Sequence, residues 1–228
     1  MQKIDPRINP SIRNYFIGDQ YKCQQTCITK NFWTADRIIA ENDNGSKPVL
    51  EWAKNIIDTT KPISILDIGC GPSQKIFKLF GQNSNIRVTG LDSEEATKLA
   101  KKFNPSGTYH PCDLDCDNSI NTVSKQIGFF DVIFCLDVIE HVLYPEKMIN
   151  LIKDHATVKT QIFITTLERD LSMNAGNLMI GSKKQEHVRE WNHTEFLTFL
   201  SFMNLKILKF KITPMKFSQH CQTFLCAI

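Results

Sequence analysis

The stretch Ser64-Ile-Leu-Asp-Ile-Gly-Cys-Gly-Pro72 runs from an apolar segment rich in β-branched residues straight into a turn that holds two glycines. The apolar part, residues 64–68, predicts a buried strand, and residues 74–80 predict the helix that follows it. Gly69 and Gly71 let the backbone approach a ligand where a side chain would clash. A strand, a glycine turn and a helix in this order indicate a nucleotide-type ligand site at the end of a parallel sheet.

The residues around the turn distinguish between kinds of ligand. A dinucleotide fingerprint would carry a third glycine where this chain has Gln74, and no lysine follows at the spacing of a phosphate-binding loop. Asp67 brings a negative charge that repels a pyrophosphate and attracts a cation. The turn therefore favours a positively charged ligand, and a nucleotide-dependent oxidoreductase stays as a rival interpretation.

Later segments add acidic residues at the expected ends of strands. Asp92 ends the segment 88–92, where a carboxylate accepts hydrogen bonds from ribose hydroxyls. Asp113 lies in His110-Pro-Cys-Asp-Leu114, and residues 129–142 hold a strand followed by Asp-Val-Ile-Glu-His. Each of these segments is a weak signal alone, but their order and spacing agree.

Over residues 63–166 the chain resembles the class I S-adenosylmethionine-dependent methyltransferases, close to the ubiquinone-biosynthesis-like branch of that family. The resemblance implies S-adenosylmethionine as cofactor and S-adenosylhomocysteine as product. It implies that Asp92 binds the ribose, that Asp113 meets the adenine amino group and that Leu114 packs on the ring. The complete cofactor site implied is Asp67, Gly69, Cys70, Gly71, Asp92, Ser93, Asp113, Leu114 and Leu136.

Short β-branched runs alternate with amphipathic segments along the rest of the chain, which predicts a parallel sheet with crossover helices. We expect strands at 87–91, 108–110, 130–135 and 161–165 and helices at 94–103 and 144–155. Two late runs, 206–212 and 222–227, predict an antiparallel hairpin. The expected fold is α/β, a Rossmann-like three-layer sandwich with a seven-stranded, mostly parallel sheet, a C-terminal antiparallel hairpin and an N-terminal helical cap.

Residues 1–60 carry aromatic side chains among polar ones, with helical spacing over 31–41. We interpret them as a helical cap and residues 61–228 as the methyltransferase domain. The cap either packs on the sheet or forms a lid over the cofactor or substrate, with Tyr15 as a candidate substrate contact. Residues 171–185 are expected to form a flap over the substrate.

Composition excludes several classes of protein. The chain has 228 residues, 42% of them hydrophobic, and a net charge of +3, which is too mild to indicate nucleic acid as a partner. No membrane-spanning segment or secretion signal is visible, so a cytoplasmic protein is expected. The eight cysteines lack the spacing of a zinc site, and no paired histidines accompany them. We therefore expect reduced, structural thiols and no metal site.

Two histidines are the candidates for catalysis, because a hydroxyl acceptor needs a base near neutral pKa. His187, in Glu186-His-Val-Arg-Glu-Trp-Asn192, is the expected base, and His141 either shares that role or shapes the cofactor pocket. The motif around His187 resembles one in a bacterial methyltransferase group that modifies glycans or small metabolites. The expected substrate contacts are Glu168, Arg169, Arg189, Glu190 and Tyr15.

Each of these assignments has a structural alternative. Residues 168–170 fit a solvated loop equally well, and residues 187–190 fit a salt-bridged anchor that places Trp191 in the core. Asn192 or Thr194 is expected to cap a helix over residues 195–203.

The acceptor class follows from motifs that the chain lacks. The Asn/Asp-Pro-Pro-aromatic motif of nucleic-acid amino-methyltransferases is replaced by Cys135-Leu-Asp-Val, and the double-acid hairpin of arginine methyltransferases is missing. We expect methyl transfer to an oxygen atom of a small molecule or saccharide, and the oligomeric state is left open. The alternative is a non-catalytic protein that binds S-adenosylmethionine for a structural or regulatory role.

Overall fold

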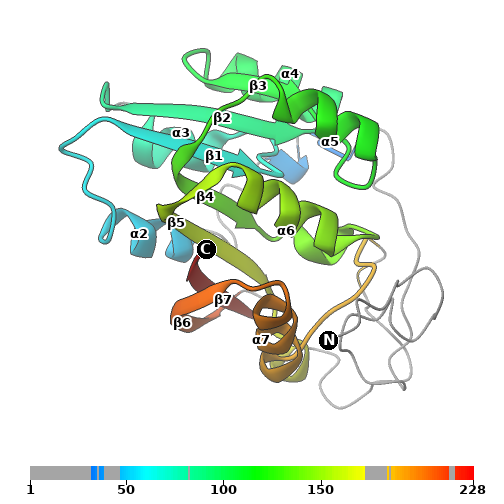
Figure 1. Ribbon diagram of the computed structural model, residues 1–228. Coiled ribbons are helices and arrows are strands. Elements are labelled where there is room, and N and C mark those ends of the chain that lie inside the picture. Colours follow the sequence, from blue (N-terminus) through cyan, green and yellow to red (C-terminus); the bar gives the residue numbers. More distant parts are fainter. Residues whose placement is uncertain are drawn as a thin grey trace.

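The computed structural model describes residues 32–34, 36–38, 47–81, 83–172, 184, 186–215 and 219–228. Within these residues seven strands form one sheet in the order β3-β2-β1-β4-β5-β7-β6 (Figure 1). The strands β1 to β5 pair in parallel, and β7 pairs antiparallel with β5 and β6. Their bounds are β1 Ile63–Ile68, β2 Ile86–Asp92, β3 Thr108–Pro111, β4 Phe130–Leu136, β5 Ala156–Leu167, β6 Lys206–Pro214 and β7 His220–Ala227. The predicted fold class and the C-terminal antiparallel hairpin are confirmed.

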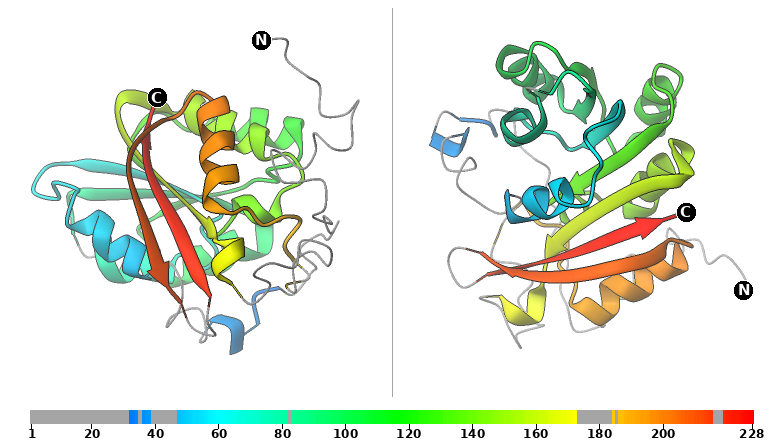
Figure 2. Two further views of the ribbon diagram at one scale, coloured as in Figure 1. Left: turned by 90° about the horizontal axis from the view of Figure 1, so that it is seen from below. Right: turned by 90° about the vertical axis from the view of Figure 1, so that its left-hand side faces the viewer.

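Helices cover both faces of the sheet (Figure 2). One face packs against α2 and α3, and the other packs against α5, α6 and α7. The α-helices are α2 Lys47–Lys54, α3 Gln74–Phe80, α4 Glu94–Phe103, α5 Asp117–Ser124, α6 Pro145–Asp154 and α7 His193–Phe202, with short 3₁₀ turns η2 Ile139–His141 and η3 Arg169–Leu171. These two helical layers with the sheet between them are the three layers that the alternating pattern predicted.

Strand β1 shows why the pattern identified the fold. Its alternate side chains enter opposite cores: Ile65 packs on the face of α2 and α3, whereas Leu66 and Ile68 pack on the face of α5 to α7. All three are fully buried. A parallel strand covered on both faces needs apolar residues at nearly every position, and this is what residues 64–68 offer.

Several elements differ from the sequence prediction in their bounds, and the contacts of two of them, β5 and α7, show why. Strand β5 begins at Ala156, well before residue 161, because Ala156 pairs with Phe130 and the Thr160 hydroxyl donates to the Phe130 carbonyl oxygen at 2.6 Å. Residues 157–159, between Ala156 and Thr160, are exposed, so no apolar run marks the start of the strand. Helix α7 begins at His193, two residues earlier than expected. Asn192 caps it through a capping box with Glu195.

The strand order creates a crevice at one edge of the sheet. After β1 the chain builds β2 and β3 on one side and then returns to place β4 on the other. The carboxyl ends of β1 and β4 are therefore neighbours whose following turns diverge, which is where open α/β sheets bind ligands.

Some sequence predictions fall wholly or partly outside the described residues: Tyr15, most of the cap 1–60 and most of the flap 171–185. The six described cysteines are all free thiols, in agreement with the prediction for them. Among the described helices none is long and apolar enough to cross a membrane.

Candidate active site

The turn after β1 has the backbone that its glycines predicted. Gly69 and Gly71 have φ angles of +69° and +51°, in the left-handed region that favours glycine. A methyl group on Gly69 would collide with Val138, and one on Gly71 would lie 2.7 Å from Cζ2 of Trp33. The amide groups of Gly69 and Cys70 both donate to the carbonyl oxygen of Leu91, which ties the turn to β2. The conformation of the turn thus depends on these backbone hydrogen bonds and on the absence of a side chain at both glycines.

Two carboxylates lie beside this turn. Asp92, at the end of β2, accepts hydrogen bonds from the amides of Gly71 at 2.8 Å and Ser93 at 2.6 Å. Asp67 is 5% exposed, and burial together with the nearby Asp92 raises its pKa to about 8. Burial also raises the pKa of Asp92. A buried acid and a half-buried acid at one end of a crevice are suited to a ligand that brings hydroxyl donors and positive charge.

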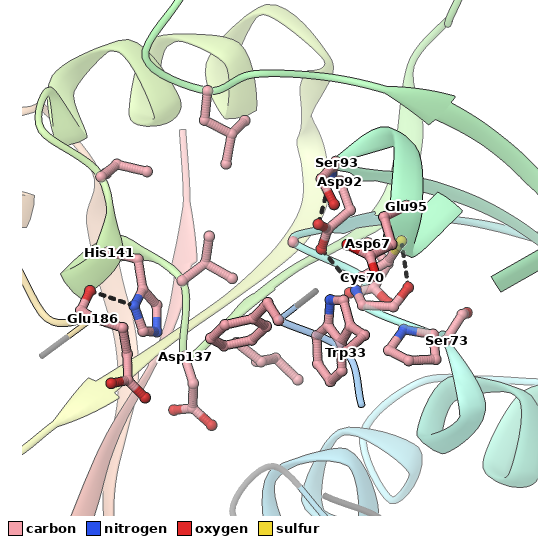
Figure 3. A pocket seen from close by; sticks show the side chains of 18 of the residues that line it. Trp33, Asp67, Cys70, Ser73, Asp92, Ser93, Glu95, Asp137, His141 and Glu186 are labelled. Atoms are coloured by element: carbon pink, nitrogen blue, oxygen red, sulfur yellow. Dashed lines mark hydrogen bonds between the residues drawn. The ribbon is translucent and has the colours of Figure 1, made fainter. Parts of the chain in front are cut away.

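A cavity of about 1400 Å³ extends from the glycine turn to the loop after β4. Figure 3 shows Asp67, Cys70, Asp92 and Ser93 gathered on one side of it beside Trp33, with His141 on the other. Its volume exceeds that of a typical pocket for one small molecule, so it has room for a cofactor and an acceptor together.

All nine residues expected to bind the cofactor line this cavity: Asp67, Gly69, Cys70, Gly71, Asp92, Ser93, Asp113, Leu114 and Leu136. They come from the ends of β1, β2, β3 and β4, which the parallel sheet brings to one edge. The structure therefore brings the expected set together, and its role in binding stays a prediction.

Both candidate catalytic histidines line the opposite end of the cavity. The Nδ1 atom of His141 lies 2.9 Å from the carbonyl oxygen of Glu186, and Nδ1 of His187 lies 2.7 Å from Oε1 of Glu190. The two rings meet edge to face with their centres 4.8 Å apart. Burial and the neighbouring His187 lower the pKa of His141 to about 4. His141 is therefore neutral at physiological pH and is a weak base.

Four of the residues expected to contact substrate lie outside the cavity lining and are each 2% exposed: Glu168, Arg169, Arg189 and Glu190. Arg169 forms a two-pronged ion pair with Glu195, with N–O distances of 2.7 and 3.0 Å. Arg189 donates to the carbonyl oxygens of Val142 and Leu143. The guanidinium groups thus anchor the backbone near the site, because their donors are directed at protein acceptors.

The segment around His187 fits the structural alternative better than direct substrate contact. Trp191 is fully buried and stacks on Phe199, as that alternative expected. His187 itself is different, since it is buried against Glu190 and still lines the cavity. The anchor therefore positions His187 at the site.

Sequence reasoning missed other residues of the site. Glu140, 2% exposed, lines the cavity beside His141 and was assigned no role. Trp33 covers the glycine turn, and Arg37 forms an ion pair with Glu186 at 3.2 Å. The aromatic character of residues 1–60 was the available signal for Trp33. The sequence carried no comparable signal for Glu140, because the motif that contains it was interpreted as part of a turn at the cofactor site.

The comparisons with known proteins agree with this geometry. Residues 46–209 match the model of a family described as a methyltransferase domain. A ubiquinone biosynthesis O-methyltransferase of Idiomarina loihiensis is 26% identical over 166 residues, which are 73% of this chain and 66% of that protein. One from Pseudomonas aeruginosa is 30% identical over 108 residues, 46% of this chain and 45% of that protein. The chain thus spans less than two thirds of the length of these relatives.

Solved structures share the fold. Magnesium protoporphyrin IX methyltransferase from Synechocystis, with bound SAH, has a TM-score of 0.60 at 16% identity and is matched over 88% of this chain and 90% of its own. The 1,6-didemethyltoxoflavin-N1-methyltransferase of Burkholderia thailandensis has a TM-score of 0.59 at 17% identity, over 84% and 82% of the two chains. At such identities the likeness concerns the fold alone.

Proposed function

Because the chain belongs to the methyltransferase domain family, we propose that it transfers the methyl group of S-adenosylmethionine to an oxygen atom of a small-molecule or saccharide acceptor. The family match confirms the predicted enzyme class and its cofactor. The observation that carries the proposal is the continuous cavity that joins the glycine turn and its acids to the histidine pair.

The residues at the glycine end fit this cofactor. Gly69 and Gly71 give the turn a left-handed backbone that a Cβ atom would strain, and Asp92 supplies a carboxylate at the strand end. We assign Asp92 to the ribose hydroxyls, Asp113 and Leu114 to the adenine, and Asp67 to the positively charged end of the cofactor. When bound, S-adenosylmethionine supplies a methyl group on a sulfonium, which an oxygen nucleophile displaces in line.

The acid at Asp67 supports a cationic ligand for an electrostatic reason. Its raised pKa means that the carboxyl holds a proton near neutral pH when no cation is near. A positive charge beside it favours the ionised form, so the cation and the proton compete for this group. A neutral or anionic cofactor would gain nothing from that exchange.

The acceptor hydroxyl belongs at the histidine end. It must lose a proton as the methyl group is transferred, and we assign that step to His187, whose ring is oriented by Glu190. His141 packs against that ring and shapes the space beside it. The oxygen acceptor is also the one named for the ubiquinone biosynthesis O-methyltransferases that this chain resembles.

The experiment is a transfer assay with S-adenosylmethionine labelled in its methyl group. The purified chain is incubated with a panel of phenols, hydroxylated quinones and sugars, and S-adenosylhomocysteine and labelled product are quantified by mass spectrometry. We expect turnover that requires an acceptor, with the label on oxygen. Cofactor binding without turnover on the panel or on a small-molecule cell extract would support the non-catalytic alternative, and label on nitrogen would contradict oxygen as the acceptor.

A further inference from the structure

Three potential metal ligands from distant parts of the chain meet at the histidine end of the cavity. Glu140 and His141 lie on η2, and His187 lies on the segment before α7. One ligand atom of each lies within 4.8 Å of the other two, and all three residues line the cavity. In the described part of the chain no other group of three or more histidine, cysteine, aspartate or glutamate side chains meets in this way.

In both imidazole rings Nδ1 is engaged by a protein acceptor, as it is in many metal-binding histidines. Nδ1 of His141 donates to the carbonyl oxygen of Glu186 (Figure 3), and Nδ1 of His187 donates to the carboxylate of Glu190. Each Nε2 atom therefore carries the lone pair, and within the described residues neither Nε2 has a hydrogen-bond partner. Histidines that bind metals show this arrangement, in which a carbonyl or carboxylate holds the far nitrogen.

Glu140 provides the independent sign of a missing partner. Its side chain is 2% exposed, and Oε2 has no hydrogen-bond partner among the described residues. A buried carboxylate oxygen without a partner is costly, and such groups in folded proteins are usually paired or coordinate metals. The geometry is also held firmly, because the Glu140 carbonyl oxygen accepts from the amide of Val188 at 2.8 Å and so joins η2 to the His187 segment.

We propose that Glu140, His141 and His187 bind one divalent transition-metal cation, such as Zn²⁺ or Mn²⁺, through the carboxylate and the two Nε2 atoms. Two imidazoles and one carboxylate suit these metals better than Mg²⁺, which prefers oxygen ligands. Bonds of about 2.0–2.2 Å to one cation require the three ligand atoms to lie closer together than the 4.8 Å that bounds their separations, so binding requires the side chains to rotate inward. This proposal departs from the sequence prediction of no metal site.

Three protein ligands leave coordination positions open toward the cavity. If the proposed function holds, the hydroxyl oxygen of the acceptor takes one of them, and the cation lowers the pKa of that hydroxyl. The hydroxyl proton then leaves to solvent, the oxygen forms the bond to the methyl carbon, and the electron pair of the breaking carbon–sulfur bond remains on sulfur. In this form of the reaction the lone pair of His187 holds the cation, and the cation takes over the activation of the hydroxyl.

The test uses the purified full chain, freed of metal with a chelator and titrated with Co²⁺ as a spectroscopic probe and with Mn²⁺ by calorimetry. We expect one equivalent of each and a Co²⁺ spectrum of nitrogen and oxygen ligands. Glu140→Gln, His141→Ala and His187→Ala are each expected to weaken binding at least 100-fold, and Glu190→Gln 10- to 100-fold. His110→Ala is the matched control, because His110 lies on β3 outside this cavity and contacts Gln126.

Cofactor binding by every variant shows that it is folded, and the nearly isosteric Glu140→Gln covers the case in which a histidine variant does not fold. Wild-type metal affinity in all three ligand variants would overturn the proposal, as would a thiolate-to-cobalt charge-transfer band, which would place the metal on cysteines. The metal titration tests this proposal separately from the proposed function, because it requires no methyl acceptor. A chain that binds the metal but never transfers a methyl group contradicts the proposed function. Turnover that survives chelation contradicts the role of the cation in activating the hydroxyl and leaves His187 as the base.

Discussion

Replacing Asp67 by asparagine should change how the stability of the cofactor-free protein depends on pH. Burial, with a contribution from Asp92, raises the pKa of Asp67 to about 8 from its ordinary value of 3.8. The folded chain therefore keeps this proton at neutral pH, and the unfolded chain releases it. The stability that the raised pKa contributes is fully present below about pH 4 and is lost as the pH rises toward 8.

The size of this pH dependence follows from the release of one proton on unfolding. Between these two pKa values the unfolding free energy of the wild type falls by about 1.4 kcal/mol per pH unit on account of Asp67. The asparagine side chain of the variant has no proton to exchange, so this slope is missing there. The variant should thus gain about 2–3 kcal/mol relative to the wild type between pH 5 and pH 7.

The measurement is urea unfolding of both proteins at several pH values between 5 and 8, in reducing buffer without cofactor. Asp154→Asn, an exposed position at the end of α6, controls for the removal of one surface carboxyl. Asp67→Asn should also lose most of its affinity for S-adenosylmethionine, and wild-type binding at pH 7 should release close to one proton. Parallel stability curves for the wild type and Asp67→Asn would refute the reasoning, because they would mean that Asp67 is already ionised in the folded protein.

Three further outcomes follow from the structure. Gly69→Ala should abolish cofactor binding, measured by calorimetry, and lower the stability by about 1–3 kcal/mol, measured by thermal melts, since it adds a methyl group at positive φ against the side chain of Val138. Gly128→Ala is the control and should change neither quantity, because Gly128 has open space around it. Asp92→Asn should weaken binding of S-adenosylmethionine at least tenfold by calorimetry, and equal affinity would remove the carboxylate from the cofactor site. Arg169→Met should lower the free energy of unfolding by about 3–5 kcal/mol, measured with urea, because Glu195 loses its ion-pair partner. Cofactor affinity should stay unchanged, and a large loss of affinity would mean that Arg169 contributes to the binding site after all.

The residues at the glycine end of the cavity could be predicted to meet because they lie at the ends of strands or directly after them. In a parallel sheet the carboxyl ends of strands meet at one edge, so Asp67, Asp92 and Asp113 had to approach one another once the strands were recognised. Local signals sufficed for each, namely an apolar run and then a glycine or an acid. The expected helices at 74–80 and 94–103 were correct to the residue for a similar reason, since helical periodicity is a local property.

The surroundings of the charged residues near the histidine end of the cavity were not predictable in the same way. Arg169 and Arg189 are of a residue type that often contacts substrates. In the structure, however, Arg169 donates hydrogen bonds to the side chain of Glu195 and Arg189 donates to a backbone carbonyl, and both acceptors lie far away in the sequence. Whether a charged side chain faces a cavity or a buried partner depends on packing between segments, and no spacing in the sequence reports it.

The sequence by itself determined the sheet and the glycine turn, because each depends on periodicity or on residues adjacent in the chain, and the cofactor class came from the resemblance of its motifs to a known family. Only the tertiary structure decided that His187 lies beside Glu140 and His141 in the same cavity. The reason is physical: the hydrogen bond from Val188 to Glu140 and the buried anchor around Trp191 bring two distant segments together. The spacing of residues in the sequence does not report that three side chains from two such segments meet.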